Sequence, residues 1–266
     1  LFFILMRLPL TPVRRFYRAL GDLDATVLRM IEEHRADQRP ERDADIIDML
    51  LAARDQDDGG AMTARQVRDE VLTLFLAGHE TTANTLAWAW HLLGQNPEAE
   101  ARMHEEVDRV LGGRGPTVED YPRLAYTRRV FAETMRLYPA AYLFGRLAMR
   151  DTQVAGYAVP RGSELLVSPF ATHRDARWWP EPERFDPDRH LPEAAKARPK
   201  YAYVPFGAGI RKCIGEHFAW MEGVLVLATV AQRWRLRPVP DHEVAIDPRI
   251  TLRPKGGLPM QVEARN

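Results

Sequence analysis

The 266-residue sequence contains one cysteine, Cys213. A single cysteine excludes an intrachain disulfide, and it excludes zinc and iron–sulfur sites that need several thiolates. Scarce cysteine is also typical of proteins that work in a reducing compartment. We therefore expect a cytoplasmic protein.

Excess charge and long apolar runs are also missing. The 37 basic and 37 acidic residues cancel, which gives no reason to expect a nucleic-acid partner. The apolar opening, residues 1–6, is far shorter than the roughly 18 residues that span a bilayer, and it lacks the features of a signal peptide. We expect no transmembrane segment. Because the sequence also lacks an initiator methionine, we expect it to begin inside a longer protein.

The segment around the cysteine, residues 205–215, reads PFGAGIRKCIG. An apolar run at 218–230 predicts a helix that begins near the cysteine. A helix N-terminus with Arg211 and Lys212 nearby favours the thiolate, which is the form that binds metals and attacks electrophiles. Glycines at 207, 209 and 215 would let a flat ligand approach the backbone.

Two other interpretations of Cys213 remain on residue type alone. Most single cysteines are small buried hydrophobic residues, although such a residue does not need three glycines and two cations around it. A nucleophilic cysteine would need a histidine base, and His217 is the only nearby candidate.

A second unusual segment lies inside a long predicted helix. Thr63 and Gln66 form a predicted capping box, and the helical pattern continues to Asn96, a length of roughly 45 Å at about 1.5 Å per residue. Its centre, residues 78–82, reads GHETT. Glycine and polar groups inside an apolar helix cost stability, which indicates a function; the alternative is a solvated stripe. A zinc H-E-x-x-H motif is excluded because residue 83 is alanine.

Residues 206–215 match F-x-x-G-x-R-x-C-x-G at every fixed position, and this pattern resembles the haem-binding signature of the cytochrome P450 family. The A-G-x-E-T pattern at 77–81 resembles the distal helix of the same family. The resemblance implies a bacterial-type member without a membrane anchor, represented here by its C-terminal, haem-binding portion. It implies haem b (iron protoporphyrin IX) as the cofactor, with Cys213 as the thiolate ligand of the iron.

The resemblance also implies roles for other residues. Thr81 and Glu80 would relay protons to dioxygen, and Arg211 and Arg146 would face the two haem propionates; the alternative for Arg146 is an exposed strand arginine. Further residues expected to line the haem are Phe206, Gly207, Gly215, Ala77 and Gly78.

A second pair of motifs implies a structural brace. The E-x-x-R spacing at Glu133 and Arg136 is uninformative alone, since an i,i+3 pair is ordinarily a surface bridge. It is followed, however, by P-E-R-F at 182–185 and then by the cysteine segment. By resemblance, Glu133 and Arg136 would lock Arg184 and brace the segment that leads to the thiolate.

The expected fold is mainly α with small β-sheets, a single cytochrome P450 domain over residues 1–266 that lacks the N-terminal portion of the family. Proline density predicts an irregular segment at 174–191, anchored by Trp178, Trp179 and Phe185. Segments 140–144 and 250–252 are expected to border an apolar substrate. Apolar periodicity predicts helices at 20–36, 45–54, 63–96, 97–111 and 126–138, and strands at 142–149, 152–154, 157–159, 164–168 and within 235–262.

The implied function is a haem-thiolate monooxygenase that inserts one oxygen atom of O2 into a small apolar organic substrate. No flavin or nicotinamide fingerprint occurs, so we expect a separate electron donor, either a ferredoxin or a flavin reductase. Two alternatives remain: a haem-thiolate peroxygenase or isomerase, and a truncated, non-enzymatic haem-binding relic.

Overall fold

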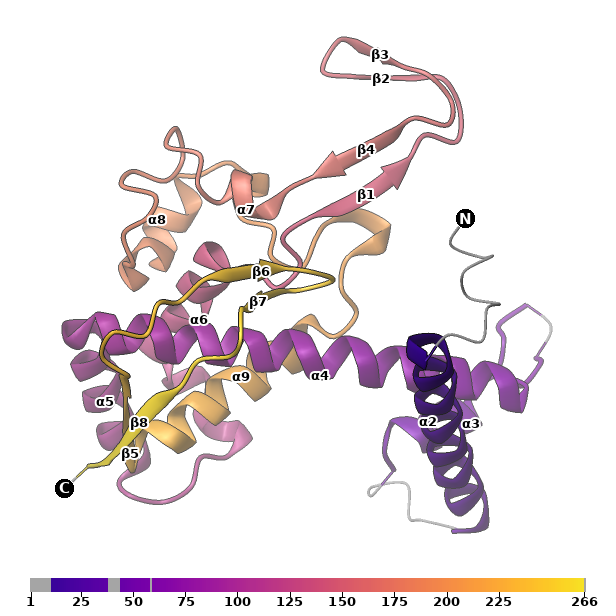
Figure 1. Cartoon of the computed structure of the whole chain (residues 1–266), viewed down its shortest axis with the longest axis horizontal. Helices are drawn as coiled ribbons and strands as arrows, with labels where there is room; N and C mark the ends of the chain where they lie inside the picture. The colour runs from indigo at the N-terminus through magenta and orange to yellow at the C-terminus, as the bar shows by residue number, and fades with distance from the viewer. Residues whose placement is uncertain (1–10, 38–43, 58, 266) are drawn as a thin grey trace. The chain divides into compact units, whose positions relative to one another are not determined.

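The computed structural model describes residues 11–37, 44–57 and 59–265 (Figure 1). The apolar opening at 1–6 lies outside the described residues. By its contacts the chain divides into two units, Leu1–Ala77 and Gly78–Asn266, and helix α4 (Ala64–Gln95) runs from one into the other. The prediction of a single domain stays a prediction.

The first unit is built from helices. It contains α2 (Thr11–Ala36), α3 (Ile46–Ala52) and the first turns of α4. Val27 and Ile31 of α2 pack with Ile47 of α3 and with Val67 and Val71 of α4. The helices predicted here are confirmed, although α2 begins nine residues earlier than the predicted residue 20, at Thr11.

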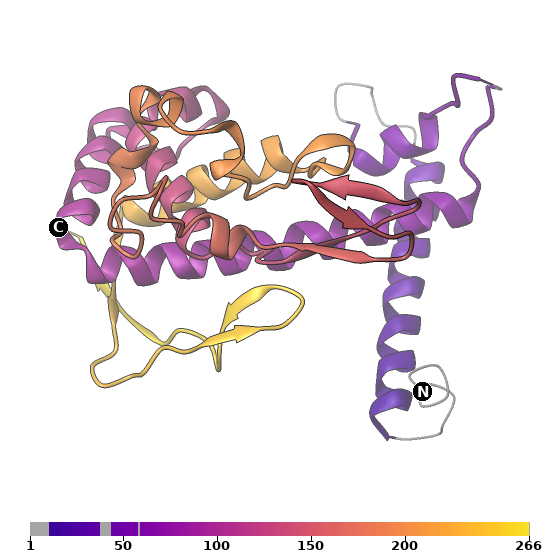
Figure 2. The ribbon, with the colours of Figure 1, turned by 90° about the horizontal axis from the view of Figure 1, so that it is seen from above.

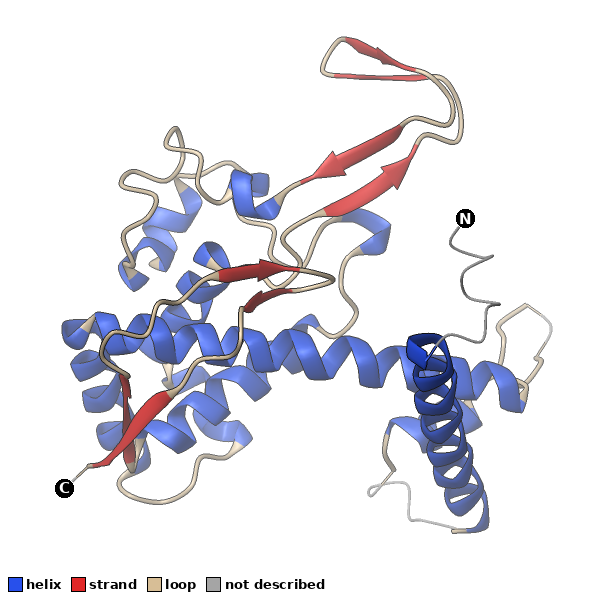
Figure 3. Cartoon of the chain, viewed as in Figure 1, coloured by secondary structure: helices blue, strands red, loops and turns tan. Residues whose placement is uncertain are grey.

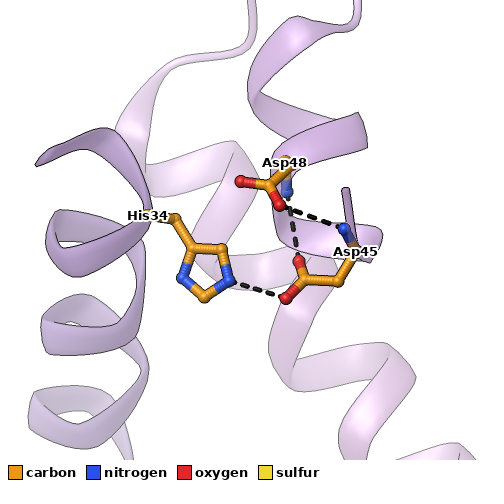
Figure 4. A group of neighbouring side chains, drawn as sticks. All are labelled: His34, Asp45 and Asp48. Atoms are coloured by element: carbon orange, nitrogen blue, oxygen red, sulfur yellow. Dashed lines mark hydrogen bonds and ion pairs between the residues drawn. The ribbon is translucent and has the colours of Figure 1, made fainter. Parts of the chain in front are cut away.

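A polar cluster fastens α2 to α3 (Figure 4). Asp45 caps α3: its carboxylate accepts from the amides of Ile47 and Asp48, while the carboxylate of Asp48 accepts from the amide of Asp45. His34 Nε2 lies 2.7 Å from Asp45 Oδ2, and this hydrogen bond is the main cause that lowers the pKa of Asp45. The three side chains lie close enough to hold a cation. Because their contacts are those of a helix cap, we assign them a structural role.

The second unit has a helical core. Besides the rest of α4 it contains α5 (Pro97–Leu111), α6 (Ala125–Leu137) and α9 (Glu216–Ala231). Phe131 of α6 packs directly on Gly223 of α9, where an added Cβ would come within 2.3 Å of the ring. Figure 2 shows α6 and α9 on one side of α4 and the yellow C-terminal strands on the other.

The capping box that starts α4 is confirmed, since the Thr63 amide donates to Gln66 Oε1 at 2.8 Å and the Gln66 amide donates to Thr63 Oγ1 at 3.3 Å. Asn96 stands at the N-cap position of α5, but it makes no side-chain cap bond. Its amide group instead donates to the carbonyl of Leu92 at the end of α4. Asn96 is therefore the N-cap of α5 by position, while its side chain bonds to the end of α4.

Strands of the described residues pair in twos, all antiparallel, outside the helical body (Figure 3). In the first of these pairs Arg146 stands opposite Leu165. The predicted fold class, mainly α with small sheets, is confirmed. The pairs are β1 (Phe144–Leu147) with β4 (Glu164–Val167), β2 (Thr152–Val154) with β3 (Tyr157–Val159), β5 (Trp234–Pro238) with β8 (Met260–Ala264), and β6 (Ile246–Pro248) with β7 (Leu252–Pro254).

The proline-rich segment 174–191 is irregular until its last turn, as predicted. Trp179 and Phe185 are buried and anchor it, whereas Trp178 is 40% exposed and does not. In the described ranges no helix combines the length and apolar character needed to cross a membrane. The remaining short elements are η2 (Val118–Arg123), α7 (Pro169–Thr172), η3 (Pro187–His190), α8 (Pro192–Lys196), η4 (Lys200–Ala202) and η5 (Gly209–Arg211).

Candidate functional site

Cys213 is held in an exposed loop just before α9. Its amide donates to the carbonyl of Phe206 at 2.9 Å, which closes the loop, and the half-buried Phe206 ring packs against Trp220 of α9 with 6.1 Å between ring centroids. Gly215 is the N-cap of α9. The thiol therefore stands at the start of a helix, where the sequence predicts it.

The surface around the thiol is apolar and open. Ile210 is fully exposed and Ile214 is 88% exposed, so the loop that carries the exposed thiol also presents two uncovered isoleucines. Gly207 and Gly209 both have φ of +70°, a conformation that favours glycine, and an added Cβ at either would meet nothing within 4 Å. This surface has room for a flat apolar group against the backbone.

The centre of α4 is also open on one side. Gly78 is exposed, and an added Cβ there would have no neighbour within 4 Å. Ala77, the last residue of the first unit, is exposed as well, and Thr81 follows it by one helical turn and is half-buried. The Thr81 carbonyl accepts from Thr85 Oγ1 at 2.9 Å.

Glu80 points toward the C-terminal strands. Thr251 Oγ1 donates to Glu80 Oε1 at 2.8 Å, so the carboxylate does not lie on a simple solvated stripe. The two segments expected to border substrate also meet here, since the Leu252 amide donates to the Ala140 carbonyl at 3.0 Å. Just before the second segment, the carbonyl of Arg249 accepts from the Tyr142 hydroxyl at 2.8 Å. The sequence does not predict the contact between Glu80 and Thr251.

The two arginines expected at the propionates are both exposed. Arg146, in β1, donates to the carbonyl of Gly145 at 2.8 Å and lies 5.0 Å over the ring of Phe144. No carboxylate of the described residues pairs with Arg146 or with Arg211 of η5. Both cations are available to an anionic group, and their predicted role stays a prediction.

The predicted brace beneath the cysteine segment is real, but its third member was wrongly assigned. Glu133 and Arg136 form a fully buried bidentate pair, with both bonds at 2.8 Å. The guanidinium of Arg184 is exposed and pairs with Glu181, and only its main-chain carbonyl reaches Arg136.

The groups that meet the Glu133 carboxylate instead are Arg189 Nε at 3.5 Å and His190 Nε2 at 2.9 Å. Burial by itself would raise the pKa of Glu133, but hydrogen bonds from His190 and Arg136 outweigh it and keep that pKa below its usual value. Burial also lowers the pKa of His190, so a neutral imidazole donates to the carboxylate. The sequence contains a pattern that could have suggested Arg189 as the third member. The order proline, acid, arginine occurs at 182–184 and again at 187–189.

This brace is tied to the cysteine loop through residues 202–204. The Val204 amide donates to His173 Nε2 at 2.9 Å, and the Tyr203 hydroxyl donates to the carbonyl of Ala132 in α6 at 2.8 Å. His173 is fully buried, and burial is the main cause that lowers its pKa to about 3. The neutral imidazole can therefore accept the Val204 hydrogen bond. A hollow of about 320 Å³ opens beside the loop, lined among others by Tyr203 and Trp220.

Comparison with known proteins identifies the family of this chain. The sequence profile described as Cytochrome P450 matches residues 1–259. The chain belongs to the cytochrome P450 family. In this cytochrome P450 chain the cofactor implied by the family is haem.

The relatives include bacterial enzymes, one named as a synthase and one as an oxygenase. Cyclooctatin synthase of Streptomyces melanosporofaciens is 48% identical over 249 residues, which cover 94% of this chain and 54% of the relative. Pentalenene oxygenase of Streptomyces avermitilis is 42% identical over 240 residues, which cover 90% of this chain and 53% of the relative. A crystal structure of the cytochrome P450DA heme domain matches with a TM-score of 0.88 and 30% identity over 96% of this chain and 56% of that one. The chain spans about half the length of the curated relatives it matches.

The residues present fit a haem. The loop before α9 carries a thiol, which is a soft donor. The same loop exposes two isoleucines, and its glycine backbone leaves open space. Arg146 and Arg211, which have no carboxylate partner in the described chain, are available for the propionate groups of a haem.

Proposed function

We propose that the chain is the haem-binding part of a cytochrome P450 monooxygenase, which inserts one oxygen atom of O2 into an apolar organic substrate. The observation that carries this proposal is the exposed Cys213 thiol just before α9, in a loop that also exposes Ile210 and Ile214. Haem b, when bound, would supply the reductive activation of dioxygen. Both units would be parts of one P450 domain, which is supported by a family match that runs through both of them.

The protein residues would bind and orient the cofactor. Cys213 would supply the sulfur ligand, and Arg146 and Arg211 would supply positive charge for the carboxylate groups at the haem edge. The backbone at Gly207 and Gly209 would lie against the ring, because neither carries a side chain that would hold it away. Phe206, packed on Trp220, would fix the loop from below.

Glu80 and Thr81 would hold and transfer protons at the haem site. The Thr81 hydroxyl can donate and accept, and the Glu80 carboxylate can exchange a proton with solvent because it is only half-buried. In the haem-loaded protein, a Thr81→Ala change is expected to divert reducing equivalents into peroxide while Thr81→Ser keeps product formation. Tight coupling retained in Thr81→Ala would count against this relay.

The substrate is proposed to be an unsaturated cyclic hydrocarbon or an alcohol derived from one. Two relatives are named as pentalenene oxygenase and cyclooctat-9-en-7-ol 5-monooxygenase, names that denote an alkene and an unsaturated alcohol. The 93% exposed Ile250 offers apolar surface beside Glu80's partner Thr251. Titration of the haem-loaded protein with a cyclic alkene should shift the Soret band, whereas a linear diol of equal size should not.

Electrons are proposed to come from a separate ferredoxin or flavin reductase. Lys200 and Lys212 line the hollow beside the cysteine loop, where Lys212 also pairs with Glu216 of α9, and these cations would suit an acidic donor. The cytoplasm is the proposed compartment, in keeping with the single cysteine.

The decisive experiment is the spectrum of the reduced, carbon monoxide-bound protein, because thiolate ligation shifts the Soret band strongly to the red of histidine ligation. Cys213→Ser should abolish this band. His217→Ala is the matched control: it removes the one nearby candidate base for a nucleophilic cysteine and should leave the band unchanged. A thiolate-type spectrum that persists in Cys213→Ser would refute the proposal.

A further inference from the structure

The carboxylate of Glu80 is held from outside its own helix. Thr251 lies in the turn between β6 and β7, is only 6% exposed, and donates from Oγ1 to Glu80 Oε1 at 2.8 Å. Asn84, one helical turn after Glu80, donates from Nδ2 to the same Thr251 oxygen at 3.1 Å. Glu80, Thr251 and Asn84 thus form one chain of hydrogen bonds.

The direction of this chain follows from the donors and acceptors involved. A threonine hydroxyl has one hydrogen and can accept through its lone pairs, whereas an amide NH2 group can only donate. Asn84 therefore takes a lone pair of Thr251, and the single hydroxyl hydrogen is left for Glu80. An ionised carboxylate accepts it well, because hydrogen bonds to charged groups are stronger than neutral ones.

The backbone around Thr251 is fixed as well. The Leu252 amide donates to the carbonyl of Ala140, and the Leu252 carbonyl accepts from Trp88 Nε1 at 3.0 Å. Glu80, Asn84 and Trp88 are spaced by four residues, so they lie along one face of α4. The hairpin is thus docked along that face at three successive turns.

The second carboxylate oxygen has a different environment. Within the described part of the chain no hydrogen bond to Glu80 Oε2 is formed, and the side chain is only half-buried. One carboxylate oxygen of Glu80 is therefore anchored by a hydrogen bond and the other is not.

We propose that Thr251 is a positioning residue, which holds Glu80 through Oε1 so that Oε2 is presented for proton transfer. This inference rests on the proposed function, because it assigns a role to Thr251 within the relay of Glu80 and Thr81. The hydroxyl is what matters, so Thr251→Ser should keep the role and the nearly isosteric Thr251→Val should lose it.

The first test uses the haem-loaded protein with its electron donor. Thr251→Val should raise the share of reducing equivalents released as peroxide about fivefold or more, and Thr251→Ser should restore the wild-type share. In a Glu80→Gln background the same Val substitution should add nothing. An equal rise in both backgrounds, or no rescue by serine, would overturn the positioning role.

The second test needs no haem. In urea unfolding of the 266-residue chain, Thr251→Val and Glu80→Met should be non-additive, with a coupling of about fivefold or more in the folding equilibrium constant. Thr229→Val on α9 is the control, because its hydroxyl bonds the carbonyl of Leu225 in its own helix, and it should be additive with Glu80→Met. Full additivity of Thr251→Val with Glu80→Met would show that the hydrogen bond is absent.

The carbon monoxide spectrum of every variant separates the two hypotheses. A thiolate-type spectrum together with an unchanged peroxide share in Thr251→Val overturns the positioning role alone. A wild-type protein without a thiolate-type spectrum overturns the proposed function itself.

Discussion

Among single residues, Glu133 and Arg136 depend most strongly on each other, because both are charged and fully buried. Removing one partner of such a pair leaves an uncompensated charge, which typically costs about 3–5 kcal/mol. We expect Arg136→Met to lower the free energy of unfolding by that amount in urea titration. The structure supplies a control in Arg184→Met, whose exposed pair with Glu181 should contribute less than about 1 kcal/mol.

The same pair of variants tests the corrected assignment. If Arg184 were a member of the buried brace, its removal would be as costly as that of Arg136. Arg189→Met should behave like the buried class, since the Arg189 guanidinium is nearly buried against the Glu133 carboxylate. Equal effects of Arg184→Met and Arg189→Met would contradict the assignment.

The sequence could predict that a brace exists, but it could not choose between Arg184 and Arg189. Each follows a proline and an acid, and spacing alone does not show which side chain turns inward. In the structure Phe185 is buried and the neighbouring Arg184 points outward, while the turn at 187–190 brings Arg189 and His190 to Glu133. The choice depends on the path of an irregular segment, for which no periodicity exists.

His173 should make the fold sensitive to acid. Its folded-state pKa is lowered to about 3, mainly by burial, whereas an unfolded histidine titrates near 6.5. Between these values the unfolded chain binds the proton, so the free energy of unfolding falls as pH decreases from about 6.5 toward 3. The contribution is fully present above pH 6.5, and its slope is at most about 1.4 kcal/mol per pH unit.

The measurement is the urea midpoint at several pH values between 7 and 4. His173→Gln keeps an acceptor for the Val204 amide but does not titrate, so its pH dependence in this range should be flatter. Part of the slope should remain, because burial is also the main cause that lowers the pKa of His104 to about 4. Identical slopes in wild type and His173→Gln would argue against a buried neutral imidazole at this position.

At the scale of elements, two glycines inside helices differ in the space around their Cα atoms. An added Cβ at Gly223 would lie 2.3 Å from the ring of Phe131, whereas one at Gly78 would have nothing within 4 Å. We expect Gly223→Ala to destabilise the chain by about 1–3 kcal/mol through overpacking of α9 on α6. Gly78→Ala should instead raise the free energy of unfolding by up to about 1 kcal/mol, because alanine is the better helix former.

The effect of Gly78→Ala on haem affinity should be opposite to its effect on stability. Gly78 lies at the open centre of α4 and is expected to line the haem, so its alanine variant should be more stable without haem yet bind haem less well. Urea titration and haem titration of both variants measure the two effects separately. A Gly78→Ala protein with unchanged haem affinity would remove Gly78 from the site.

The ends of strands were predicted well where a turn lies directly beside them, and less well elsewhere. Strands β2 and β3 were predicted to the residue, since only Ala155 and Gly156 separate them, both with positive φ. The strand predicted at 142–149 is shorter at both ends, because pairing with β4 covers only Phe144–Leu147. A strand extends as far as its partner pairs with it, and one sequence segment does not show where its partner stops.

For the whole molecule, local order was predictable and distant pairing was not. The succession of motifs along the chain anticipated the family and the fold class. The contact of Glu80 with Thr251 joins residues 171 positions apart, and nothing in either local pattern signals it. Such pairs depend on how α4 and the β6–β7 hairpin dock, which is a property of tertiary packing.

The global stability of the chain should depend on haem if Cys213 anchors it. A ligand that binds only the folded state stabilises it by about 2.7 kcal/mol at a concentration one hundred times its dissociation constant. Urea unfolding of the 266-residue chain with and without added hemin should show a gain of this order. Since an apolar ring could also adhere to exposed isoleucines without ligation, Cys213→Ser is the necessary comparison and should lose most of the gain. If Cys213→Ser gains as much stability as the wild type, the haem is held by apolar contact alone, and the sulfur is not its anchor.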